Sequence, residues 1–170
     1  EQAMQVEPIP NAHFQYVDLP GWLRLMLKYQ GTHQIYAYLW QIKAYLTARQ
    51  LHRQNKFDIF HHITYANDWM ASFIGALLPI PYVRGPGGGA HRTPKDIEKE
   101  YSRKGRLWEK IRRIGQWVFR HDPFFTRGQG RAGAILVCNR DSERQIPHKW
   151  SHKVQLFPVS GVSSEDLALS

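Results

Sequence analysis

Short apolar segments alternate with helical stretches along this chain, and the alternation limits the fold more than any other sequence feature. Short runs of apolar and aromatic residues predict strands, which cover residues 57–63, 80–84, 132–138 and 153–157. Apolar residues at helical spacing predict helices, which cover residues 34–54, 67–78, a long region from 93 onward, and 141–149. This alternation predicts an α/β fold with an open parallel sheet and helices on both faces.

Capping residues set two of the expected helix starts. Asn67 or Asp68 can cap the helix that runs to Leu78. Thr93 can cap the long helical region, with Pro94 at its first position. In sheets of this kind ligands bind beyond the carboxyl ends of the strands. The loops that matter are therefore those that follow Ile63, Arg84, Cys138 and Phe157.

The charge of the chain is strongly basic and unevenly placed. Its 170 residues contain 23 Lys or Arg against 14 Asp or Glu, a net charge of +9. Residues 92–131 hold 12 basic and 5 acidic residues, so this segment carries +7 of the excess. The balance indicates an anionic partner, which can be nucleic acid, anionic lipid or a phosphorylated ligand.

Two classes of protein are excluded by composition. A single cysteine, Cys138, rules out a disulfide scaffold and a zinc site with several cysteines. No apolar run approaches the roughly 18 residues of a membrane span. A cytoplasmic location is the expected default, with peripheral contact at the inner face of the membrane as an extension of it.

A glycine-rich segment, residues 85–89 (GPGGG), is the strongest local signal for a binding site. Gly87, Gly88 and Gly89 permit close backbone approach to a ligand, and clustered N–H groups can hold a phosphate or a sugar hydroxyl. No Gly-Lys-Ser/Thr follows, so the segment is not a P-loop. The alternative is a flexible turn.

Three histidines lie near this segment. His61 and His62 end a predicted strand, where they point to opposite faces, so at most one of them faces a cleft. A metal site formed by this pair and His91 needs three converging ligands, and a packed or hydrogen-bonded histidine is the alternative. His91 and Arg92 directly follow the glycines and can contact a phosphate or take part in proton transfer.

A basic helix with aromatic residues, residues 99–120, is a candidate for contact with an anionic membrane. In the alternative interpretation, Ile111 and Ile114 pack into the core and the basic face is solvated. We favour the core-packed role for these two isoleucines, and membrane contact by neighbouring residues is the less favoured alternative. The membrane-surface candidates are Arg103, Lys104, Arg106, Trp108, Arg112, Arg113 and Trp117.

Several motifs together resemble the acceptor-side domain of group 1 (family 4-like) glycosyltransferases. They are residues 38–41 (YLWQ), 57–64 (FDIFHHIT), 81–89 (PYVRGPGGG) with Thr93-Pro94, 131–139 (RAGAILVCN) and 153–162 (KVQLFPVSGV). The similarity covers residues 36–162. Many relatives have a histidine just after the strand that matches residues 80–84. In this chain that position falls near Gly87, and the nearest histidine is His91.

The resemblance implies a GT-B architecture, in which two Rossmann-like domains face a cleft. Residues 1–162 would form the N-terminal, acceptor-binding domain without its first strand, and residues 163–170 a linker towards an absent donor domain. The implied enzyme transfers a sugar, with retention, from a nucleotide-sugar to a glycan or lipid-linked acceptor of cell-surface polysaccharide biosynthesis. This half would bind no cofactor or metal, because the nucleotide-sugar is held mostly by the donor domain.

These inferences give a set of expectations about the site. The chain alone is expected to bind an acceptor without turnover, and an unpaired sheet edge is expected to favour self-association. His91 is the candidate catalytic residue, and Arg84 is expected to pair with a phosphate or a core carboxylate. The candidate substrate contacts are Gly87, Gly88, Gly89, His62, Thr64, Arg84, Arg92 and Asn139. The alternatives are a non-catalytic sugar- or phosphate-binding module and a basic nucleic-acid-binding α/β domain; of the anionic partners, nucleic acid is the least expected.

Overall fold

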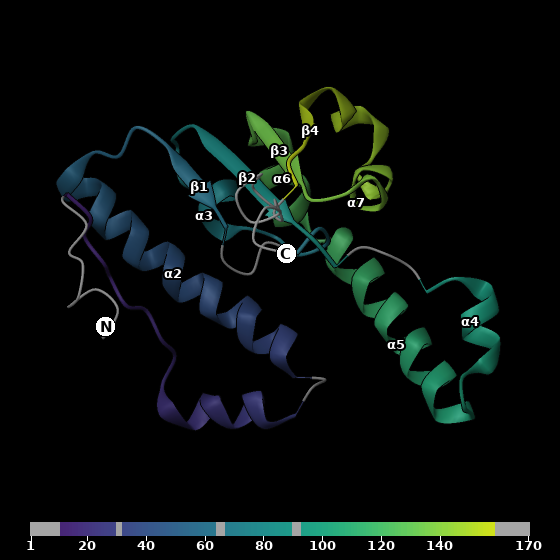
Figure 1. Cartoon of the computed structure of the whole chain (residues 1–170). Helices are drawn as coiled ribbons and strands as arrows, with labels where there is room; N and C mark the ends of the chain where they lie inside the picture. The colour runs from purple at the N-terminus through teal and green to yellow at the C-terminus, as the bar shows by residue number, and fades with distance from the viewer. Residues whose placement is uncertain (1–10, 30–31, 64–66, 90–92, 159–170) are drawn as a thin grey trace, which may run out of the picture.

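A parallel four-stranded sheet with helices packed around it forms the centre of the molecule (Figure 1). The computed structural model describes residues 11–29, 32–63, 67–89 and 93–158. The strands are β1 (Phe60–His62), β2 (Tyr82–Gly87), β3 (Ala134–Val137) and β4 (Val154–Leu156), and they pair in the order β1-β2-β3-β4. The α/β fold with a parallel sheet, predicted from the alternation of strands and helices, is confirmed.

The helices fall into four groups along the chain. Two precede the sheet, η1 (Gly21–Lys28), which is a 3₁₀ helix, and α2 (His33–Asn55). One, α3 (Phe73–Leu77), joins β1 to β2. The connection from β2 to β3 contains α4 (Lys95–Glu100), α5 (Arg103–Arg120) and α6 (Pro123–Arg131). The connection from β3 to β4 contains α7 (Arg140–Gln145) and η2 (His148–Lys153).

The two faces of the sheet are covered unequally. Tyr82, Ile135 and Val137 lie on one face and are almost completely buried, where they pack against Phe125 of α6 and Trp150 of η2. On the other face, Val83 and Leu136 are half-buried and His61 is exposed. Strands that follow one another in sequence order, joined by right-handed crossovers, place their connecting helices on one face. The apolar core of the described chain therefore lies mainly on that face.

Strand β2 continues further than the sequence predicts. Its expected end was Arg84, but the strand runs through Pro86 to Gly87, and Gly87 is in register with Val137 of β3. The register shifts between Arg84 and Gly87, where Gly85 has φ +95°. The first glycines of the glycine-rich segment thus belong to the sheet and not to a loop.

Helix starts differ from the expected caps. Ser72, and not Asn67 or Asp68, caps α3 by accepting from the Gly75 N–H at 3.2 Å. The long helical region expected after Thr93-Pro94 is broken into three helices. Ser102 caps α5, and Asp122, followed by Pro123, caps α6. The broken region allows α6 to pack beneath the sheet while α5 leaves it.

Helix α2 agrees with its expected range within one residue at each end. It buries Tyr36, Ala37, Gln41 and Ala44, and the Tyr38 hydroxyl donates to Asp122 Oδ2 at 2.8 Å. The apolar residues that recur at helical spacing, Ile35, Ile42 and Leu46, remain exposed. Tyr38, at the same helical spacing, packs against the core, so the described residues cover this stripe only in part.

A candidate ligand-binding edge of the sheet

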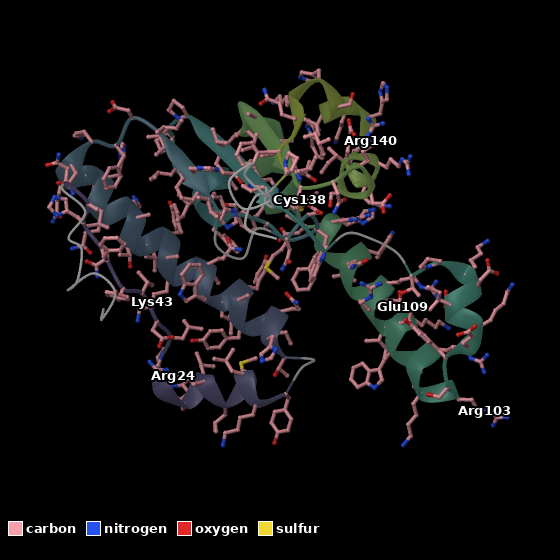
Figure 2. All side chains as sticks on the ribbon, in the orientation of Figure 1. Arg24, Lys43, Arg103, Glu109, Cys138 and Arg140 are labelled. Atoms are coloured by element: carbon pink, nitrogen blue, oxygen red, sulfur yellow. The ribbon has the colours of Figure 1, made fainter. Side chains whose placement is uncertain are left out.

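The carboxyl ends of β1, β2 and β3 meet at one edge of the sheet. After β1 the chain returns to β2 through an isolated parallel bridge between Asn67 and Gly88, and the Asp68 N–H donates to the Gly88 carbonyl at 3.1 Å. At the end of β3, the Cys138 N–H donates to the Gly87 carbonyl at 3.3 Å and its Sγ lies 2.7 Å from the same oxygen. Figure 2 labels Cys138 at this edge. The end of β2 is thus held from both sides.

Two glycines in this segment are required by the backbone. Gly85 and Gly89 have φ values of +95° and +85°, a region that disfavours any residue with a Cβ. A Cβ on Gly85 would lie 2.2 Å from the Leu136 carbonyl oxygen, and a Cβ on Gly88 would lie 3.3 Å from Cys138 Sγ. The segment is therefore a close-packed strand end whose surface at Gly88 is bare backbone.

A buried polar link joins the loop after β1 to helix α7. Ser142 Oγ donates to Asp68 Oδ2 at 2.6 Å, and both residues are almost fully buried. Asn139 caps α7, with its Oδ1 accepting from the Ser142 N–H at 2.8 Å. Asn139, a predicted substrate contact, does lie at the carboxyl edge, but its side-chain oxygen accepts a hydrogen bond from the first turn of α7. Sequence reasoning missed Asp68 and Ser142 here; the position of Asp68 just after β1 was the signal that could have found it.

Arg84 does not extend into the site. Its side chain is 2 % exposed, and Nη2 donates to the carbonyls of Asn67 at 2.5 Å and Met70 at 3.0 Å. Its guanidinium lies 5.1 Å from the centre of the Phe125 ring. Of the two partners expected for Arg84, a phosphate or a core carboxylate, the second is not found: no ion pair of Arg84 with a carboxylate occurs among the described residues. Carbonyl oxygens and an aromatic face take its place. Arg84 thereby fixes the loop that places Asn67 against Gly88.

The two adjacent histidines point to opposite faces, as the strand period predicts. His62 is buried and stacks on Phe60, with ring centres 6.1 Å apart. His61 is exposed, and its Nε2 lies 2.5 Å from the Gly85 carbonyl oxygen. In the part of the chain that the structure describes, no group of three His, Cys, Asp or Glu residues is arranged to hold a metal ion.

The predicted site residues separate into three sets. Gly87, Gly88, Gly89 and Asn139 lie together at the carboxyl edge. Arg84 and His62 lie on the buried face, towards the helices. The predicted residues Thr64, His91 and Arg92 lie outside the described residues, as does the expected linker at 163–170.

A separate cavity of about 240 Å³ lies between α2 and the outer side of β1. It is lined by Trp40, Gln41, Phe60, His62, Ser72 and Ile74, among others. Gln41 Oε1 accepts from the Phe73 N–H at 3.3 Å, whereas its buried Nε2 has no hydrogen-bond partner among the described residues. No described strand pairs with this outer side of β1, so the cavity and the strand edge form one unfilled margin of the sheet.

Comparison with protein-family models, with curated proteins and with solved structures found no match to this chain. None of the described helices is long and apolar enough to cross a membrane.

Proposed function

We propose that this chain is the acceptor-binding half of a retaining glycosyltransferase that transfers a sugar from a nucleotide-sugar to a glycan or lipid-linked acceptor. The observation that carries the proposal is the bare backbone of Gly88, which sits at the carboxyl edge of a parallel sheet, with Asn67 on one side and Cys138 on the other. Ligands of open α/β folds bind at this edge, and a surface without side chains lets a sugar approach the backbone.

The roles proposed for the two domains follow from the chemistry of glycosyl transfer. Donor and acceptor must be held together in a closed cleft from which water is excluded. In this proposal the present domain orients the acceptor hydroxyl, and a second, donor-binding domain holds the nucleotide-sugar. Since one wall of the cleft cannot align both substrates, the chain by itself binds its acceptor without transferring a sugar. The cellular location in this proposal is cytoplasmic.

The single cysteine provides a direct test of binding. Cys138 is half-buried and its Sγ is next to Gly87 and Gly88, so a saccharide at this edge would shield it. The rate of alkylation by iodoacetamide should fall several-fold in the presence of a short-chain polyprenyl diphosphate-linked N-acetylglucosamine. The same lipid without its sugar should protect less. Equal protection by both lipids, or by neither, contradicts an acceptor-sugar site.

A matched variant separates ligand contact from helix capping. Asn139→Ser keeps an oxygen that can cap α7 but removes the amide, so it should weaken the protection while α7 remains folded. Sugar transfer is then assayed with this chain and with the chain extended through a donor domain. Transfer by the extended chain alone supports the proposal. Protection of Cys138 without transfer in either form favours a non-catalytic sugar-binding module instead.

A further inference from the structure

Helix α5 has its polar side chains inside and its apolar side chains outside. The residues it buries are Glu109 and Gln116. Phe119, near the C-terminal end of α5, packs against the buried cluster that contains Trp69. The other large apolar residues of α5 are about half exposed or more, from 47 % at Ile111 to 62 % at Trp117. The exposed apolar residues of α5 are Leu107, Trp108, Ile111, Ile114, Trp117 and Val118. This arrangement contradicts the core-packed role expected for Ile111 and Ile114.

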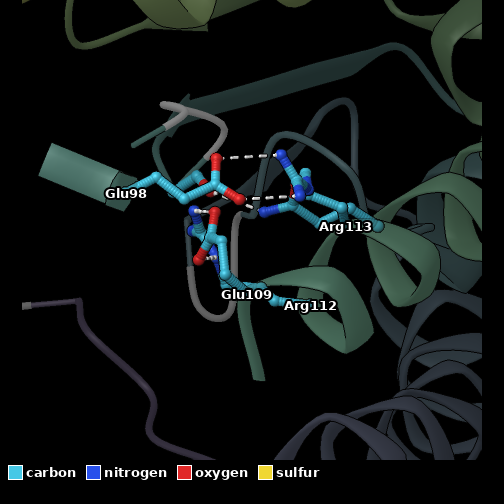
Figure 3. A network of polar contacts seen from close by, with 6 residues as sticks. Glu98, Glu109, Arg112 and Arg113 are labelled. Carbon is cyan, nitrogen blue, oxygen red and sulfur yellow. Dashed lines mark hydrogen bonds and ion pairs between the residues drawn. The ribbon is translucent and has the colours of Figure 1, made fainter. Parts of the chain in front are cut away.

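Side chains on the polar side of α5 form hydrogen bonds within the protein. Arg113 forms two hydrogen bonds with Glu98 of α4, at 2.9 and 3.2 Å, and Arg112 forms two with Glu109, at 2.7 and 3.0 Å (Figure 3). Hydrogen bonds from Arg112 are the main cause that holds the pKa of Glu109 below its ordinary value. The α4–α5 pair extends away from the sheet (Figure 1). We call α4 and α5 together the arm.

The exposed apolar residues form a continuous stripe along α5. At about 100° per residue, the four aliphatic residues Leu107, Ile111, Ile114 and Val118 fall within an arc of about 60°. Trp108 and Trp117 lie on the two flanks of this arc. The basic residues Arg103, Lys104 and Lys110 also lie at its borders, whereas Arg112 and Arg113 point towards the opposite, polar side. An aliphatic centre with tryptophans and basic residues at its margins is the pattern of a helix that lies in a membrane interface.

We propose that the stripe of α5 docks onto the surface of an anionic lipid bilayer. The charge of the helix selects this occupant, because α5 carries seven Lys or Arg residues and one Glu. Pairing of two copies through the stripe would bring two strongly positive borders together, which opposes association. Anionic headgroups are attracted to the same border while the apolar stripe enters the acyl boundary.

Docking would also place the candidate ligand-binding edge near the lipid. Gln116, on the side of α5 opposite the stripe, donates from Nε2 to the Gly89 carbonyl at 3.3 Å. The helix that touches the bilayer is thus bonded to the end of the glycine-rich segment. If the proposed function holds, this geometry favours an acceptor that resides in the membrane; the docking itself does not depend on that function.

Vesicle co-sedimentation of the whole chain tests the docking without any sugar present. The chain should bind vesicles of equimolar phosphatidylcholine and phosphatidylglycerol, bind phosphatidylcholine alone far less, and be released as NaCl is raised. Ile111→Ser with Ile114→Ser should reduce the bound fraction at least tenfold. Both side chains are about half exposed, so the variant should keep the circular dichroism spectrum of the parent.

A matched variant controls for exposed apolar surface in general. Ile35→Ser with Leu46→Ser removes residues of similar exposure, 48 % and 55 %, from α2 and should leave lipid binding unchanged. Lys104→Gln with Lys110→Gln should weaken binding to the anionic vesicles and flatten its salt dependence. Equal binding to both vesicle types overturns the proposal, and so does equal loss in the α2 and α5 variants. Binding of the stripe to an acidic protein while anionic vesicles are ignored also overturns it.

Discussion

The core under the sheet and the arm use the same residue types in opposite ways. In the core, Ile135 is 1 % exposed and lies in one cluster with Phe125 of α6 and Trp150 of η2. In the arm, Ile111 is 47 % exposed, and the carboxylate of Glu109 is turned inward. The core strand comes from a continuous apolar run, and the arm helix comes from apolar residues at helical spacing. The difference shows that amphipathic spacing defines a face, whereas the neighbouring elements decide which face is buried.

Charge explains why the arm is turned this way. Arg113 of α5 pairs with Glu98 of α4 and so links the two helices, whereas Arg112 pairs with Glu109 within α5. The two arginines remain 38 % and 46 % exposed, and ion pairs that are partly open to water contribute modest stability. The arm is therefore expected to be held less firmly than the core, whose apolar residues are removed from water.

The largest contrast is expected from one substitution made in the two regions. Ile135→Ala should lower the free energy of unfolding by about 2–5 kcal/mol, because it opens a cavity in a packed core. Ile111→Ala should change it by less than about 0.5 kcal/mol, because the side chain is largely exposed. Urea unfolding followed by circular dichroism measures both. Similar losses in the two variants would mean that the arm packs into the fold.

Two glycines provide a second, smaller contrast. Gly85→Ala should cost about 1–3 kcal/mol, because the new Cβ would meet the Leu136 carbonyl and the positive φ is unfavourable. Gly115→Ala on α5 meets no atom within 4 Å and should stabilise the helix by about 0.5–1 kcal/mol. Urea unfolding reports the first change, and amide hydrogen exchange along α5 reports the second. Faster exchange in Gly115→Ala would be inconsistent with an unhindered arm helix.

The smallest expected effect is a pH dependence confined to the arm. The pKa of Glu109 is lowered, chiefly by hydrogen bonds from Arg112, so folding of the arm favours the ionised carboxylate. Its contribution, about 1 kcal/mol or less, is present above the ordinary pKa of 4.5 and is lost as the pH falls through the lower folded value. Amide exchange in α5, corrected for the intrinsic rate, should therefore increase on acidification before exchange in β3 does. Glu109→Gln should remove this difference, and a difference that persists would place its cause elsewhere.

Much of the fold could be predicted from local patterns. The strands around Ile135 and Val154 and the range of α2 follow directly from apolar runs and helical spacing. The cap of α3 at Ser72 was missed, because Asn67 and Asp68 are equally good caps by type. Their actual roles depend on contacts with residues far along the chain, such as the bond from Ser142 to Asp68.

The site was predicted only in part, for a related reason. The glycine-rich segment could be recognised by composition, and it does lie at the carboxyl edge. That this segment continues β2 could not be predicted from composition, because glycine and proline disfavour strands. The pairing of Gly87 with Val137 of β3 holds it in the sheet. Arg84 was expected to pair with a phosphate or with a carboxylate in the core. Local spacing could not reveal that carbonyls of the loop after β1 would take that place.

The order of the strands has a consequence for how the protein is made. Each strand pairs with the next one in the sequence, so a chain emerging from the ribosome can add strands to the sheet one after another. Strands β1 and β2 can pair as soon as β2 has been synthesised, whereas β3 follows only after the whole arm and α6. During that interval β2 presents an unpaired edge. A pause in translation within the arm would prolong the exposure of this edge to pairing with other chains.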